Sequence, residues 1–272
     1  MHGFAIFFMT LALAAGPAAM AAEEIIPLPR PRPNIPFEPR SFAEANPGLF
    51  DTAELTTEPS DCRLRLAEMA EVEPLPRLIG PGECGGSDMV RIEYVLMPDK
   101  SRVAIKPAPV LNCPMAESLA AWLRDDVAPR TPALGAKLRE VRNYDDYNCR
   151  TRNRVFGAMV SEHGKGNALD VRWLKLDDGR IVYPVDITID KEFRDAMRQS
   201  ACARFTTVLG PGADSAHESH IHLDQIERTN GYRLCQWEVR EPPKVGEEIA
   251  GIPLPQPRPA VLREMDKQSR RL

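Results

Sequence analysis

Two short segments hold four of the five histidines in the chain. His163 is followed seven residues later by Asp170, and His220 is followed two residues later by His222. Imidazole nitrogens and carboxylate oxygens are ligands that zinc accepts, and three protein ligands leave a fourth position open to water. Side chains at positions i and i+2 of an extended strand point to the same face, so His220 and His222 should face one space. The pattern therefore indicates an open, catalytic zinc site rather than a closed structural one.

The residues around these histidines resemble the zinc signature of a known superfamily. Ser161-x-His163-x-x-Gly166-x-Ala168-x-Asp170, followed by His220-x-His222, resembles the D-Ala-D-Ala metallopeptidase and hedgehog-type superfamily. Four further segments resemble the bacterial extensin-like C-terminal family: Gly80-Pro81-Gly82-x-Cys84-Gly85, Leu111-Asn112-Cys113-Pro114, Tyr147-Asn148-Cys149-Arg150 and Leu209-Gly210-Pro211-Gly212. The resemblance covers roughly residues 61–240, and the two zinc segments are its most specific part.

The superfamily resemblance implies a role for each of these side chains. It makes His163, Asp170 and His222 the ligands of Zn2+, and it places His220 beside the metal as acid, base or transition-state stabiliser. Which of His220 and His222 is the ligand and which the helper stays open from the sequence. A zinc-bound water with its pKa lowered to about 7 would supply hydroxide to attack an amide carbonyl. A neighbouring base would take the proton and pass it to the leaving amine.

Two charged residues near the segments have two interpretations each. In the superfamily an upstream arginine stabilises the substrate carboxylate or the developing oxyanion, a role that suits a guanidinium group. Arg150 is the candidate, with Arg152 and Arg154 as competitors, and the alternative is a surface arginine beside a disulfide. Glu218 is a candidate general base, although it precedes His222 by four residues and misses the Glu-x-x-His register of the superfamily. It is otherwise a solvated turn residue.

Small and polar residues complete the expected site. Gly164, Gly166 and Ala168 are small and would let the backbone turn tightly between ligands. Ser161 would either orient a ligand or serve as a turn residue. Asp224 would either hydrogen-bond an imidazole or simply follow the strand, and His217 is expected to be a loop residue rather than a ligand.

Charge and hydropathy exclude some classes of protein. The net charge is -4 and no long Lys/Arg block is present, which argues against nucleic-acid binding. Residues 4–20 are apolar, and Ala19-Met20-Ala21 is an A-x-A cleavage site, so residues 1–21 are predicted to be a secretory signal peptide. The alternative is an uncleaved anchor helix, for which the apolar stretch is barely long enough. We expect no stable membrane span after cleavage.

Six cysteines in an exported chain indicate a set of disulfides. No pair has the C-x-x-C spacing of a zinc ribbon. Chain order alone suggests the pairs Cys62–Cys84, Cys113–Cys149 and Cys202–Cys235.

Proline-rich segments flank a domain that we predict over residues 61–240. Residues 22–60 are expected to be a Pro-rich linker, and residues 241–272 a Pro-rich and charged tail. The sequence Ile-Pro-Leu-Pro-x-Pro-Arg-Pro occurs at residues 26–33 and again at residues 252–259. These copies are either two stiff polyproline II linkers or two docking segments for one partner or for the wall polymer.

Hydrophobic periodicity predicts the elements of the domain. Helices are expected over residues 63–72, 115–126 and 190–205, the last of them capped by Asp190. Strands are expected over residues 90–97, 102–105, 138–144, 168–176, 181–189, 206–209 and 219–226. Helices and strand hairpins in separate runs predict an α+β fold with a mainly antiparallel sheet and flanking helices. The resemblance implies a hedgehog/D-Ala-D-Ala-peptidase-like zinc fold.

The function expected from these observations is that of an exported zinc peptidase or amidase acting on peptidoglycan stem peptides in the periplasm or cell envelope. A D,D-carboxypeptidase or endopeptidase would fit the resemblance. The alternative is a non-catalytic wall-binding or structural envelope protein that retains the metal site. Metal bound without any cleavage would favour a binding module, and absence of metal would favour a structural role.

Overall fold

The computed structural model describes residues 41–46, 48–51 and 58–242. They all belong to the second of two units of the chain, Arg40–Leu272. The expected signal peptide and both copies of the Pro-rich repeat lie outside the described residues, as does almost all of the expected tail.

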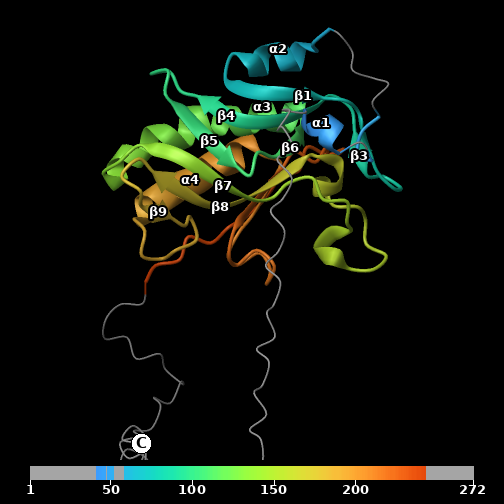
Figure 1. The fold of residues 1–272 in the computed structure, drawn as a ribbon. Helices are drawn as coiled ribbons and strands as arrows, with labels where there is room; N and C mark the ends of the chain where they lie inside the picture. Colours follow the sequence, from blue (N-terminus) through green and yellow to red (C-terminus); the bar gives the residue numbers. More distant parts are fainter. Residues whose placement is uncertain (1–40, 47, 52–57, 243–272) are drawn as a thin grey trace, which may run out of the picture. The chain divides into compact units, whose positions relative to one another are not determined.

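One mixed sheet organises the described residues (Figure 1). Its ten strands follow the order β1-β4-β5-β7-β8-β11-β10-β12, with β6 paired to β4 and β9 paired to β8. The strands are β1 Ala70–Leu75, β4 Met89–Leu96, β5 Arg102–Lys106, β6 Val110–Asn112, β7 Leu138–Asp145, β8 Ala168–Leu176, β9 Ile181–Val182, β10 Thr207–Leu209, β11 Ile221–Asp224 and β12 Leu234–Gln236. Only the pairs β5–β7 and β10–β12 are parallel. A second small sheet pairs β2 Leu78–Ile79 with β3 Gly85–Gly86.

The α-helices are short apart from one. They are α1 Phe42–Ala45, α2 Asp61–Ala67, α3 Cys113–Ala121 and α4 Lys191–Arg204, and α3 continues into a π-helical turn, Trp122–Val127, and a 3-10 turn, Ala128–Leu134. Asp190 caps α4 as predicted, because its carboxylate accepts a hydrogen bond from the backbone N–H of Phe193 at 2.8 Å. Within the described part of the chain, no helix has the length and apolar character needed to cross a bilayer. The fold class is therefore α+β with a mostly antiparallel, mixed sheet.

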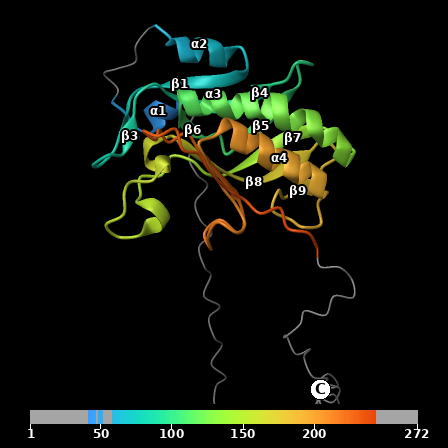
Figure 2. The same ribbon diagram turned by 180° about the vertical axis from the view of Figure 1, so that it is seen from behind.

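Helices α3 and α4 lie together on one face of the sheet (Figure 2). Leu119, Trp122 and Met197 from this layer share one buried cluster with Val141 of β7 and Leu174 of β8. Removing this apolar surface from water is the main driving force for the fold. The helices leave the opposite face of β7, β8 and β11 to polar side chains.

Strand alternation turns the predicted ligands to that opposite face. In β8, Leu169 and Val171 join the buried cluster, whereas Asp170 lies between them and points the other way. His222 of β11 is paired in register with Asp170, so both side chains project from the same face. The sheet thus positions two of the three expected ligands as direct neighbours.

Two of the predicted elements are wrong in extent. The helix predicted over residues 63–72 ends at Ala67, and residues 70–75 form β1 instead, because pairing with β4 along its whole length outweighs local helical spacing. The strand predicted over residues 181–189 stops at Val182, since Pro184 has no N–H to donate to a ladder.

Part of the expected linker packs against the domain. Residues 42–45 form α1, and Phe50 makes an isolated bridge to Leu78. Ala43 and Phe50 are buried in a second, smaller cluster with Met89. Ordered structure in the second unit therefore begins before the predicted boundary at residue 61.

Three disulfides join Cys62 to Cys113, Cys84 to Cys149 and Cys202 to Cys235, and none of the six cysteines is free. Only the last pair was predicted correctly; the pairs Cys62–Cys84 and Cys113–Cys149 are wrong. Packing of α2 against the start of α3 brings Cys62 and Cys113 to a Cα–Cα distance of 6.1 Å, which chain order does not reveal. Three disulfides indicate an oxidising, exported environment.

Candidate functional site

His163, Asp170 and His222 converge on the face of the sheet opposite α3 and α4. His163 lies on the 3-10 turn Glu162–Lys165, and its Nε2 is 3.3 Å from Asp170 Oδ1 and 3.1 Å from His222 Nδ1. His222 Nδ1 is 2.9 Å from Asp170 Oδ1. All three side chains are buried, and one ligand atom from each lies within 4.8 Å of the others. The structure therefore brings together the three predicted ligands from two distant segments.

The other nitrogen of each imidazole is held by the protein. His163 Nδ1 is 2.7 Å from the carbonyl oxygen of Asp146, which only accepts, so Nδ1 carries the proton and Nε2 keeps its lone pair. His222 Nε2 donates to Asp224 Oδ2 at 3.0 Å, which realises the hydrogen-bonding alternative for Asp224. Metal-ligating histidines are commonly oriented by such contacts to their second nitrogen. The donor set and its supports thus fit a zinc ion.

The charges of this group explain the pKa values of its members. Burial by itself would lower the pKa of His222, but the carboxylates of Asp170 and Asp224 raise it to about 10. Burial would raise the pKa of Asp170, yet its contacts with the imidazoles of His163, His220 and His222 hold that pKa well below its usual range. Without a metal, the proton on His222 Nδ1 is directed toward the other two candidate ligand atoms, His163 Nε2 and Asp170 Oδ1. A divalent cation would replace this proton with a larger positive charge in the same place.

His220 contacts the oxygen of Asp170 that faces away from the other two imidazoles. Its Nε2 is 3.2 Å from Asp170 Oδ2. A carboxylate only accepts hydrogen bonds, so Nε2 carries the proton and Nδ1 of the neutral ring is an acceptor. Nδ1 is buried and has no hydrogen-bond partner among the described residues. The structure therefore places His220 as a neighbour of the ligand set with one free acceptor nitrogen.

His217 lies in the loop before β11, as expected, and its ring is buried in the site. Its Nδ1 lies 2.6 Å from Asp214 Oδ1, and its ring centroid is 5.4 Å from that of His220 and 5.7 Å from that of His222. Burial lowers the pKa of His217, against the opposing effect of Asp214. The Asp-x-x-His spacing in the segment before His220 was the available sequence signal for this pair.

A tight turn carries the chain from His163 to Asp170. Gly166 has a left-handed φ of 63°, and a Cβ there would lie 2.4 Å from the terminal methyl of Met89 and 3.2 Å from the backbone nitrogen of Asn112. The expectation that glycine is needed between the ligands is met at this position.

Arg150 lines the cavity that contains these histidines. Its Nη2 is 2.9 Å from Asp145 Oδ2, and its Nε is buried without a hydrogen-bond partner among the described residues. The cavity has a volume of about 630 Å³, and Arg152, Arg154 and Ser161 also line it. The arrangement offers donors beside the candidate metal ligands.

The structure does not bring Glu218 to the site. Its carboxylate is exposed, accepts two hydrogen bonds from Arg240 at 2.9 and 3.2 Å, and accepts one from the backbone N–H of Gly212 at 3.0 Å. Hydrogen bonding to Arg240 lowers the pKa of Glu218. Glu218 is also absent from the described residues that line the cavity.

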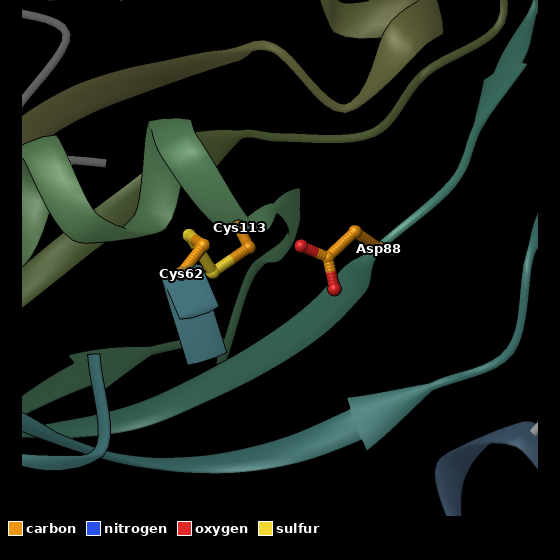
Figure 3. A group of neighbouring side chains, drawn as sticks. All are labelled: Cys62, Asp88 and Cys113. Carbon is orange, nitrogen blue, oxygen red and sulfur yellow. A yellow bond between two sulfur atoms is a disulfide. The ribbon is translucent and has the colours of Figure 1, made fainter. Parts of the chain in front are cut away.

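A second group of potential ligands, Cys62, Asp88 and Cys113, is already occupied by protein contacts (Figure 3). The two sulfur atoms are bonded to each other, so neither is a thiolate. Asp88 is 2.7 Å from Arg63 Nε and accepts a hydrogen bond from Ser60 at 2.8 Å. This group has a structural role in the oxidised protein.

Comparison with known proteins identifies a family to which the chain is similar. The family described as Extensin-like protein C-terminus matches residues 60–236, which is more than half of the chain. No curated protein and no solved structure matches the chain significantly.

Proposed function

The chain belongs to the extensin-like protein C-terminus family, and we propose that it is an exported zinc-dependent peptidase or amidase that acts on peptidoglycan peptides. The observation that carries the proposal is the convergence of His163 Nε2, Asp170 Oδ1 and His222 Nδ1 within 4.8 Å, beside the cavity. The likeness of the two histidine segments to the D-Ala-D-Ala metallopeptidase and hedgehog-type superfamily supports both the reaction class and that superfamily's zinc fold.

Zn2+ is the ion that suits this donor set. Two imidazoles and one carboxylate form a three-ligand set with an open position, which zinc uses in catalytic sites. When bound, the ion supplies a Lewis acid that polarises a carbonyl group and acidifies water. The backbone carbonyl of Asp146 holds the His163 ring through its Nδ1, and the carboxylate of Asp224 holds the His222 ring through its Nε2.

His220 is the proposed general base and acid of the reaction. Its free Nδ1 accepts a proton from the attacking water as the new C–O bond forms, and it delivers a proton to the amine as the C–N bond breaks. The hydrogen bond from Nε2 to Asp170 fixes the tautomer that this role needs. The His217–Asp214 pair faces the same ring and is placed to orient it. No role is assigned to Glu218.

Arg150 is the proposed anchor for the substrate. A D,D-carboxypeptidase substrate ends in a carboxylate, and the unpartnered Nε of Arg150 is a donor beside the site. Arg152 and Arg154 add positive charge to the same cavity wall. The three disulfides are consistent with a protein that functions outside the reducing cytosol. We therefore propose that it is located in the periplasm or cell envelope.

Digestion of purified muropeptides tests the proposal. The protein should contain about one zinc ion per chain, and a chelator should block cleavage. His163→Ala should lose both metal and activity, whereas His220→Ala should lose activity and keep most of the metal. Bound metal without any cleavage would contradict the enzyme proposal and favour a binding module. Loss of metal from His220→Ala would mean that His220 is a metal ligand and that His222 has the acid-base role.

A further inference from the structure

The loop between β7 and β8 has a rigid base and a tip made of apolar side chains. At its base Cys149 is bonded to Cys84, and Thr151 pairs with Val160 in an isolated antiparallel bridge. The backbone N–H of Arg152 donates to the carbonyl of Met159 at 3.0 Å. Residues 150–160, which we name the β7–β8 loop, therefore form a small hydrogen-bonded unit rather than a loose connection.

The tip of the β7–β8 loop exposes three large apolar side chains to water. The side chains concerned are Val155, Phe156 and Met159, which are 57%, 102% and 65% exposed. In Figures 1 and 2 this yellow-green segment stands away from the sheet. Single exposed apolar residues are ordinary, but three at one tip indicate a surface that is covered in use.

Positive charge surrounds this apolar tip. Arg152 and Arg154 are exposed beside the tip, Arg150 at its base is paired with Asp145, and residues 147–161 contain no Asp or Glu. The whole chain has a net charge of -4, so this cationic segment is a local exception. An apolar tip with a basic collar is the composition of segments that lie in the interface of an anionic membrane.

The contacts of the loop argue against a lid that closes over the site. Arg152, Asn153 and Arg154 line the cavity, and the apolar residues of the tip are not among the described residues that do so. Asn153 Nδ2 donates to Asp214 Oδ2 at 3.3 Å, which ties the base of the loop to the His217 segment. The base therefore belongs to the site, and the tip is directed to something outside it.

We propose that the β7–β8 loop is a membrane anchor: Val155, Phe156 and Met159 insert into the interfacial layer of an anionic lipid bilayer, and Arg152 and Arg154 contact its headgroups. Docking in this way would hold the mouth of the cavity close to a membrane surface. The inference does not depend on the proposed peptidase activity, because the inserted side chains Val155, Phe156 and Met159 are not among the described residues that line the cavity, and the binding event needs no metal.

Flotation with vesicles tests the anchor, using the chain from Ala22 onward so that the apolar leader does not itself bind lipid. Vesicles of equal parts phosphatidylcholine and phosphatidylglycerol should carry the protein, and vesicles of phosphatidylcholine alone should carry much less. Phe156→Gln should weaken binding by about tenfold or more, and Arg154→Gln by about fivefold. Leu64→Gln, at a 54% exposed leucine on α2, is the matched control and should leave binding unchanged.

A fluorescent variant adds a readout of insertion. The emission of Phe156→Trp should shift to the blue on anionic vesicles, and lipids brominated in the acyl chains should quench it. Binding that survives Phe156→Gln unchanged would overturn the anchor. An equal loss of vesicle binding in Leu64→Gln would also overturn it. Binding to soluble dextran sulfate that is as strong as vesicle binding and is unaffected by Phe156→Gln would show that the partner is an acidic polymer instead.

Discussion

The ring of His222 has a carboxylate at each nitrogen, Asp170 at Nδ1 and Asp224 at Nε2. These carboxylates raise the pKa of His222 to about 10, against the effect of burial. The Nδ1 proton lies where His163 Nε2 and Asp170 Oδ1 also point. At the scale of single residues, a divalent cation that binds here would therefore have to displace this proton.

Zinc binding should release about one proton per ion near neutral pH, because ligand nitrogens must be deprotonated. A pKa of about 10 keeps His222 protonated in the metal-free protein at pH 7. Zinc affinity should consequently rise by about tenfold per pH unit between about pH 7 and pH 9. Calorimetry in two buffers with different ionisation enthalpies measures the proton count. Zinc binding with no proton release would contradict this description of His222.

Replacing Asp224 with asparagine tests the support of that ring. Asp224→Asn keeps the size of the side chain and removes its charge, so zinc affinity should fall by about 10- to 100-fold. Glu227→Gln removes an exposed acid three residues away and is the control. Equal zinc affinities in both variants would show that the charge of Asp224 does not strengthen zinc binding by His222.

The sequence was sufficient to name the candidate ligands but not the groups that hold them in place. His163, Asp170 and His222 stand in a recognisable order, and strand alternation predicts a common face. Asp146 enters through its backbone carbonyl, which any residue type could supply, so no sequence signal marks it. The burial of His217 depends on the loop before β11 placing its ring against those of His220 and His222, and this is a tertiary property.

At the scale of elements, the turn between His163 and Asp170 sets the distance between two ligands. Gly166 and Gly179 both have left-handed φ values, 63° and 89°, but only Gly166 has atoms within 4 Å of the position that a Cβ would occupy. An alanine at either glycine should cost about 1–2 kcal/mol of backbone strain. The steric clash should cost Gly166→Ala about 1–3 kcal/mol more.

Urea unfolding of the two alanine variants measures this difference. Gly166→Ala should also lower zinc affinity, because relief of the clash moves the turn that carries His163. Gly179→Ala should leave zinc affinity unchanged. Equal free energies of unfolding for the two variants would mean that Met89 and the backbone at Asn112 shift to accept the added methyl group, and would contradict the predicted clash.

Elements with strong local signals were predicted well. Asp190 and the apolar spacing of α4 identify that helix from local sequence, and Ala168–Leu176 is a strand with the predicted bounds. The first residues of β1, 70–72, were predicted as the end of a helix, because the identity of this strand depends on β4 and not on its own spacing. The pairing of the cysteines depends in the same way on tertiary contacts between segments that are distant in the sequence.

At the scale of the whole molecule, the Cys84–Cys149 disulfide is the one closest to the site. The position of a Cβ on Gly164 would be 3.1 Å from Cys84 Sγ, and the backbone N–H of Asn148 donates to the carbonyl of His163 at 3.2 Å. The Cys202–Cys235 disulfide instead joins α4 to β12. The first disulfide therefore supports the turn that carries His163, whereas the second supports the packing of α4 on β12.

Removing both cysteines of one pair distinguishes these roles. Cys84→Ser with Cys149→Ser should lower stability and also weaken zinc binding and vesicle binding, because the turn of His163 and the base of the β7–β8 loop both lose support. Cys202→Ser with Cys235→Ser should lower stability by a similar amount, about 2–4 kcal/mol, and keep zinc binding. Peptide mapping without reduction should recover all three pairs in the unchanged protein.

Anomalous diffraction at the zinc edge, from crystals of the purified protein, is the most direct measurement of the central proposal. One peak is predicted at a point about 2.0–2.2 Å from His163 Nε2, Asp170 Oδ1 and His222 Nδ1. A structure grown with zinc in which these three atoms stay hydrogen-bonded to one another, with no peak between them, would contradict the metal centre and the enzymatic function built on it.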